Sequence, residues 1–149
     1  MAWTTPSSQV TGDLITAAIW NQNIVSNPIA LLPIGVDIII DGGGAPIAAG
    51  SVADVEVPAK LTLTSVRLVA DQTGCMIVDI YKTAYAGLPP AAGSSICGDH
   101  PTLTAASKME DTSLSGWTTD AAAGDWWRIS VSSNTCITKA TLSLRGNRS

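Results

Sequence analysis

Alternating apolar and polar residues dominate the chain from Ile34 onward and predict a mainly β protein. Short runs rich in β-branched residues are separated by clusters of Gly, Pro, Asp and Asn, which is typical of strands joined by turns. The predicted strands are residues 36–40, 51–57, 61–70, 75–82, 105–111, 114–118, 126–132 and 137–145. Eight short strands with one helix beside them favour an antiparallel β-sandwich of jelly-roll type, with an N-terminal arm.

Residues 61–81 carry the strongest local pattern. Two apolar runs flank Asp71-Gln72-Thr73-Gly74, which predicts a β-hairpin with a short turn. The apolar phase slips near Ser65, and a β-bulge there would account for the slip. In the second run Met76, Val78 and Ile80 share one face. Because both faces of the hairpin are rich in apolar residues, we expect both to be covered.

A helical pattern replaces the alternation over residues 13–26, and Asn27-Pro28 ends it. Apolar side chains lie all round this short helix, since Ile15, Ile19 and Trp20 occupy the side opposite Leu14. Such a helix needs partners on more than one side. The change of pattern at Ile34 divides the chain into an arm with a helix, residues 1–33, and a β-sandwich domain, residues 34–149.

The charge content changes the picture of the surface. Charged residues make up 13% of the chain, about half of the ~25% usual in soluble domains. A surface so poor in charge predicts burial in an assembly, although a neutral Ser/Thr-rich surface on a monomer is the alternative. The net charge is −4 without a basic cluster, which argues against a nucleic-acid partner. The longest uncharged stretch contains two prolines, so no membrane-spanning helix is predicted.

Candidate catalytic groups are sparse. The single histidine, His100, follows Ser94, Ser95 and Cys97, but these residues form no nucleophile elbow, and a Cys97/His100 dyad rests on spacing alone. The three glycines at 42–44 lack the lysine and helix of a phosphate loop. No carboxylates share the spacing of a calcium site or a glycosidase pair. We therefore expect no enzyme activity, no metal and no cofactor.

The three cysteines, Cys75, Cys97 and Cys136, are an odd number at wide spacings. They are interpreted as free, buried thiols, with a Cys75–Cys136 bridge as the alternative.

Tryptophans are the remaining candidates for a contact. In the pair Trp126-Trp127 one indole must face outward while its neighbour faces the core. Three tryptophans are candidates for contact with a glycan or a neighbouring subunit: Trp117, Trp126 and Trp127. A subunit contact is favoured, because no polar cluster in the sequence marks a sugar pocket.

Two sets of segments resemble tailed-bacteriophage virion proteins of the tail-fibre and decoration type. One comprises Trp3-Thr4-Thr5-Pro6 and residues 10–18 and 21–27; the other comprises residues 41–44, 55–58, 69–74, 78–82, 85, 88–90, 116–119 and 123–125. The resemblance implies a structural subunit on the outside of a virion, either a decoration (cement) protein or a fibre or adaptor subunit. It also implies assembly in the host cytoplasm and a threefold axis.

In this interpretation residues 1–33 attach the domain to the major capsid or tail protein, and copies of the chain form a homotrimer. The expected anchor residues are Trp3, Leu14, Ile15, Ile19, Trp20 and Ile24. The alternative function is a carbohydrate-binding module that recognises host surface glycans.

Overall fold

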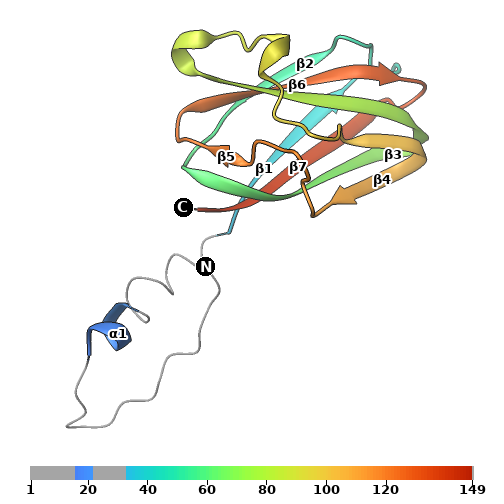
Figure 1. Ribbon diagram of the computed structural model, residues 1–149. Helices are drawn as coiled ribbons and strands as arrows, with labels where there is room; N and C mark the ends of the chain where they lie inside the picture. Colours follow the sequence, from blue (N-terminus) through green and yellow to red (C-terminus); the bar gives the residue numbers. More distant parts are fainter. Residues whose placement is uncertain (1–15, 22–32, 149) are drawn as a thin grey trace.

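The computed structural model of the chain describes residues 16–21 and 33–148, and it is mainly β with antiparallel pairing, as predicted (Figure 1). The strands are β1 (Pro33–Asp41), β2 (Val52–Glu56), β3 (Leu61–Ala84), β4 (Thr102–Asp111), β5 (Asp120–Ala121), β6 (Asp125–Asn134) and β7 (Lys139–Arg148). The helical elements are α1 (Ala17–Trp20) and two 3-10 turns, η2 (Tyr85–Gly87) and η3 (Ala92–Ser94).

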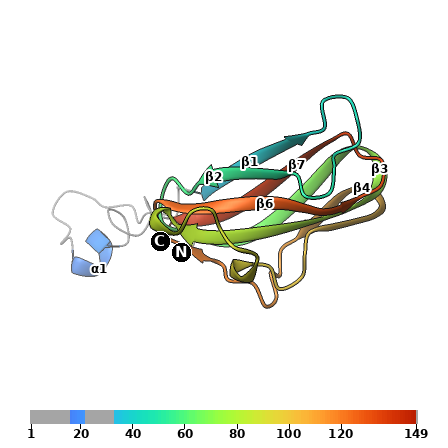
Figure 2. The ribbon, with the colours of Figure 1, turned by 90° about the horizontal axis from the view of Figure 1, so that it is seen from above.

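One antiparallel sheet contains all seven strands. Its order is β1-β7-β3-β6-β2, and β4 and β5 pair with the remaining edge of β3. The sheet curls until its edge strands β1 and β2 come into contact, so it nearly closes into a barrel (Figure 2). The interior is a single apolar cluster to which all strands except β2 contribute buried side chains.

The predicted hairpin at 61–81 is wrong, because β3 is one strand of 24 residues that runs through the predicted turn. Its N-terminal arm, 61–70, pairs with β7, whereas its C-terminal arm, 76–84, pairs with β6. The polar residues between the arms bond to the β6–β7 connection instead of closing a turn. Asp71 accepts hydrogen bonds from Thr138, and the Gln72 amide donates to the carbonyl of Cys136.

Residues 42–51, 71–75, 105–106 and 135–138 lie where strands connect or where the pairing register shifts, and we call these segments together the fold line. The connection between β1 and β2 lies against that between β6 and β7, where Gly42 N donates to Thr138 O at 2.8 Å. Strand β4 has a positive φ of 47° at Ala105, beside the pairing of Ala106 with Gly74. A Cβ on Gly74 would lie 2.8 Å from Cys136 Sγ, so a glycine permits this close approach.

The inward faces follow the predicted alternation. A register shift between Leu63 and Ser65 confirms the bulge, and Met76, Val78 and Ile80 are fully buried. The outward face is less covered than expected, since Val69 and Ile77 remain exposed in the described chain.

Residues 114–118 are a loop and not a strand, which corrects another prediction. Leu114 has a positive φ of 44°, and the Asp111 carboxylate accepts from the backbone N–H of Ser113 and of Leu114. Leu114 and Trp117 are nevertheless buried, because this loop covers an end of the core. The apolar residues at 114–118 therefore reflect the burial of this loop and do not indicate a strand. Strand β5, two residues long, was not predicted.

The helix predicted at 13–26 is described only over its middle. Thr16 caps α1, with its hydroxyl accepting from Ile19 N at 3.3 Å. None of the α1 residues is buried. Four of the expected anchor residues lie outside the described residues: Trp3, Leu14, Ile15 and Ile24.

Candidate functional site

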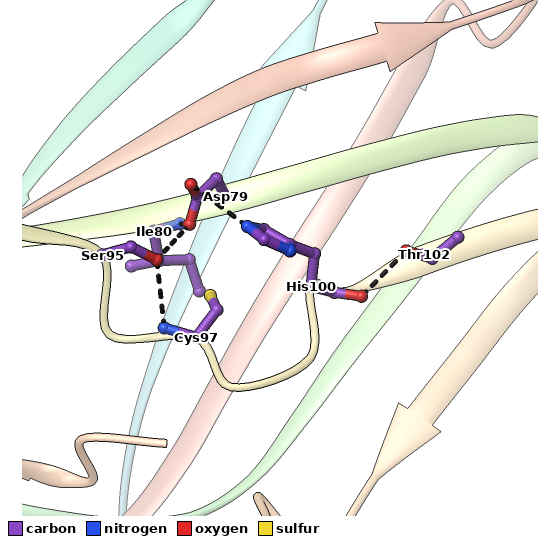
Figure 3. A network of polar contacts seen from close by, with 6 residues as sticks. All are labelled: Asp79, Ile80, Ser95, Cys97, His100 and Thr102. Carbon is purple, nitrogen blue, oxygen red and sulfur yellow. Dashed lines mark hydrogen bonds and ion pairs between the residues drawn. The ribbon is translucent and has the colours of Figure 1, made fainter. Parts of the chain in front are cut away.

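A polar cluster centred on Asp79 joins β3 to the long loop that follows it (Figure 3). Asp79 is the one buried charged residue of the described chain, with 7% of its surface exposed. Its Oδ1 accepts from Ser95 Oγ at 2.6 Å and from Ile80 N at 2.7 Å. Its Oδ2 lies 3.2 Å from His100 Nε2. Four groups therefore meet at one carboxylate, including the Tyr81 hydroxyl.

The same cluster fixes the backbone of the loop. Ser95 Oγ also accepts from Cys97 N at 3.2 Å, and Ile96 N donates to Ile80 O at 2.9 Å. Beyond the cluster, Thr102 Oγ1 donates to His100 O at 2.8 Å at the start of β4. These bonds hold the loop against the C-terminal arm of β3.

The protonation states follow from these contacts. Burial raises the pKa of Asp79, but the hydrogen bonds from Ser95, Ile80 and Tyr81 and the nearby His100 outweigh it, so this pKa lies below its usual value. Burial raises the pKa of Cys97 to about 12. At neutral pH Asp79 is therefore a carboxylate and Cys97 a protonated thiol.

This arrangement does not match nucleophilic catalysis. An activated serine needs a base to receive its proton, usually a histidine that a carboxylate orients. Here Ser95 and His100 both contact Asp79, and the Ser95 hydroxyl donates its hydrogen bond to that carboxylate and not to His100. The protonated Cys97 is a poor nucleophile. The cluster therefore acts as a clamp between loop and sheet, and His100 is part of it and not an isolated surface group.

The described residues also form no cluster of metal ligands. Within residues 16–21 and 33–148, no three His, Cys, Asp or Glu side chains gather in a way that would hold a metal ion. The three cysteines are free thiols in the structure, but none is buried as expected: Cys75 is exposed, and Cys97 and Cys136 are half-buried.

The tryptophans divide between core and surface. Trp127 faces inward and is fully buried, whereas Trp126 faces outward, which confirms the alternation predicted for the pair. Trp117 is buried in the loop after β4. Because both indoles are covered by their own domain, Trp117 and Trp127 offer no surface to a glycan or a subunit. Of the three candidate contacts, Trp126 alone is partly exposed.

A pocket of about 380 Å³ lies near the ends of β3 and β6. Lys82 Nζ donates to Asp120 O at 2.6 Å and lies 3.9 Å from Asp125 Oδ2, and Thr62 Oγ1 donates to Asp120 Oδ1 at 2.7 Å. These polar groups form hydrogen bonds and an ion pair with one another. Among the charged side chains that line the pocket, Lys82, Asp120 and Asp125 therefore already have polar partners within the protein.

The outward side of β1, β7 and β3 carries an apolar row. Cross-strand register aligns Ile39 with Thr141 and Thr141 with Val69, and we call these three the Ile39–Val69 row. Ile39 is 63% exposed and Val69 49%. Ion pairs surround the row: Asp41–Lys139 at 3.0 Å, Asp37–Arg145 at 2.9 Å and Arg67–Glu110 at 2.8 Å.

Helix α1 is the other exposed apolar element. Trp20 is 53% exposed, and Ile19 is half-buried. Of the six expected anchor residues, these two are the ones that the structure describes. No helix among the described residues is long and apolar enough to cross a membrane.

Comparisons with known proteins add little to this geometry. No family model and no curated protein matches the chain. Among solved structures, the chain is similar to the serine protease of Aeromonas sobria in complex with its chaperone, with 14% identity and a TM-score of 0.36. The same protease without the chaperone gives 13% identity and a TM-score of 0.32. The chain spans 27% of either matched chain, and at these TM-scores the likeness carries no argument.

Proposed function

We propose that this chain is a structural, non-enzymatic subunit of a bacteriophage virion. It is a decoration or a fibre or adaptor subunit on the outside of the particle, attached through residues 1–33 to the major capsid or tail protein. The observation that carries the proposal is α1, which exposes Trp20 and has no buried residue. An apolar helix whose side chains are not buried against its own domain needs a partner on another molecule.

The proposal includes a jelly-roll connectivity for the domain. Four pairs of segments meet at the fold line: β1 and β2, β7 and β6, the two arms of β3, and the two ends of β4. A sheet that is folded in half along this line places the two members of each pair in opposite layers, which is the jelly-roll arrangement. Viral capsid domains and lectins are among the proteins that use it.

A homotrimer is the second part of the proposal. The exposed apolar side chains of the Ile39–Val69 row are suited to the centre of a protein interface. The three ion pairs around the row are suited to the polar rim of such an interface. A contact of about 800 Å² per subunit suffices for specific association. Closed symmetry limits the assembly, because an open contact would polymerise.

The proposal is tested on purified particles from the bacterium that produces the chain. Mass spectrometry should find the chain in the particles at a copy number divisible by three. A chain reduced to residues 34–149 should keep its β circular dichroism but be absent from particles. The Ile19→Ala/Trp20→Ala double variant is the milder form of this change and should be depleted from particles. Incorporation of the truncated chain at full copy number would rule out anchoring by the arm.

A carbohydrate-binding module is the second candidate function, and one observation favours it. Tyr85 packs beside the partly exposed Trp126, with ring centroids 6.4 Å apart.

A further inference from the structure

The outward face of β2, β6 and the C-terminal arm of β3 combines aromatic and polar side chains. Register aligns Glu56 with Trp126 and Trp126 with Thr83 in one row across the three strands. The adjacent row on the same face contains Asp54, Arg128 and Tyr81. We call these six residues, together with Tyr85, the Trp126 face.

The rings of Trp126 and Tyr85 pack against each other on this face. Tyr85 follows β3 directly and is 72% exposed, and its ring is tilted by 47° from the Trp126 ring. The rings thus form an open angle and not a flat stack. One face of a pyranose is lined with C–H groups, and such a face packs on an indole while its rim touches a second ring.

Hydrogen-bonding groups flank Trp126 on both sides. In the part of the chain that the structure describes, the side chains of Glu56 and Thr83 donate and accept no hydrogen bond. Arg128 is held in place by Asp54, with Nε to Oδ1 and Nη2 to Oδ2 both at 2.7 Å. The face therefore offers an unpaired carboxylate, an unpaired hydroxyl and a rigid guanidinium around one indole.

We propose that the Trp126 face binds an uncharged saccharide, with a sugar ring stacked on Trp126 and bordered by Tyr85. The sugar hydroxyls donate to Glu56 and exchange hydrogen bonds with Thr83. Sialylated and other anionic sugars are disfavoured, because Arg128 is neutralised by Asp54 and Glu56 has no cationic partner. This inference rests on the second candidate function, the carbohydrate-binding module, and does not depend on the virion function proposed above.

A protein contact fits the same face less well. The centres of protein interfaces are depleted of charged residues. Here charged side chains lie directly beside Trp126, on the neighbouring strand and two residues along its own. The apolar surface of the Trp126 face itself comes from its aromatic rings, whereas the Ile39–Val69 row lies on the other half of the sheet.

The test uses the full-length chain labelled with ¹⁵N, whose five indole N–H groups report on five tryptophans. The probes are the neutral oligosaccharides maltotriose, cellotriose, chitotriose and lactose, with sialyllactose as the anionic counterpart of lactose. An array of neutral glycans extends the panel. We expect the Trp126 signal to shift with at least one neutral sugar and sialyllactose to bind more weakly than lactose.

Variants identify the surface that binds. Trp126→Ala and Tyr85→Ala should each weaken binding by about tenfold or more. Glu56→Gln preserves the shape of the face and should weaken binding while leaving the fold intact. Trp20→Ala is the matched control, because it removes an exposed indole from another part of the chain, and it should leave binding unchanged.

Three results would overturn the inference. One is the absence of binding to every neutral glycan of the panel and array. Another is binding that persists in folded Trp126→Ala and Glu56→Gln variants. The third is a Trp126→Ala variant that loses self-association in light scattering although the wild type binds no sugar, which would make the face a protein contact. None of these results depends on whether the chain is found in virions.

Discussion

Ser95 Oγ lies 2.6 Å from Asp79 Oδ1, and this bond ties the loop after β3 to the middle of the strand's C-terminal arm. The partners are 16 residues apart in sequence. Because Asp79 is buried, the bond does more than a surface contact would: it satisfies a charge that water cannot reach freely.

Removal of the Ser95 hydroxyl should therefore destabilise the domain. For Ser95→Ala we expect a loss of about 1–3 kcal/mol in the free energy of unfolding, since a buried carboxylate loses one of its donors. Urea unfolding followed by circular dichroism measures it. Ser132→Ala is the control, because Ser132 is exposed on β6, and it should change stability by less than about 0.5 kcal/mol. Equal losses in the two variants would contradict the clamp.

Acid should weaken the domain through the same carboxylate. The folded-state pKa of Asp79 is lowered, so its contribution to stability is present above the unfolded value of about 3.9 and is lost as the pH falls through the folded value. The free energy of unfolding, measured by urea titration between about pH 6 and pH 3, should fall at the acid end. Asp79→Asn should be less stable at neutral pH and should show a shallower fall.

Part of the acid dependence should remain in that variant. The pKa of Asp54 is lowered by its hydrogen bonds with Arg128, and that of Asp111 by the backbone N–H of Ser113. An identical pH dependence in wild type and Asp79→Asn would show that the cluster carries no linked proton.

Gly98 should not tolerate a side chain. A Cβ there would lie 2.1 Å from Ser115 O and 2.7 Å from Gly116 C, and both are backbone atoms that cannot rotate away. Gly98→Ala should cost about 1–3 kcal/mol of stability. Gly93→Ala, in η3 of the same loop, places its Cβ in open space and should be neutral or slightly stabilising. Thermal melting of both variants makes the comparison.

The two adjacent tryptophans of β6 should respond very differently to truncation. Trp127→Ala removes a fully buried indole and should cost about 3–5 kcal/mol. Trp126→Ala removes a partly exposed one and should cost less than about 1.5 kcal/mol, chiefly through its contact with Tyr85. Chemical unfolding decides it. Comparable losses of stability in the two variants would contradict the assignment of Trp127 to the core side of β6 and of Trp126 to the outer side.

Self-association should depend on the Ile39–Val69 row. We expect light scattering of the full-length chain at micromolar concentration to give three times the 15.3 kDa mass. The Ile39→Asp/Val69→Asp double variant should stay folded and shift toward the monomer mass, because it buries charge in the contact. Val52→Asp, at an exposed apolar position on β2, is the control and should leave the mass unchanged. A wild-type monomer would rule out the trimer.

The inward residues of the strands could be predicted from the sequence because burial with a period of two is a local pattern. Val78, Ile80 and Ile129 lie where the alternation places them. The path of β3 could not be predicted in this way. Asp71 and its neighbours have the composition of a turn, but the decision between turn and bend depends on Thr138, which is 67 residues away.

The Asp79 cluster left a weak signal in the sequence. A single aspartate between Val78 and Ile80 interrupts an apolar run, and a buried carboxylate of that kind needs donors. Which donors it uses depends on how the loop returns to β3, and spacing alone pointed to Cys97 and His100 instead of Ser95. The Trp126 face was missed for the same reason. Glu56, Trp126 and Thr83 come from three separate strands, and only the register brings them together.

The pairing of β1 with β7 has a consequence for the order of events during synthesis. Pro33 lies opposite Asn147, so β1 is made first among the described strands but has no hydrogen-bonded neighbour until β7, the last of them, has been made. Nearly the whole described domain must therefore be translated before its sheet is complete. Completion of β7 is therefore the step that gives β1 its hydrogen-bonded neighbour and completes the described sheet.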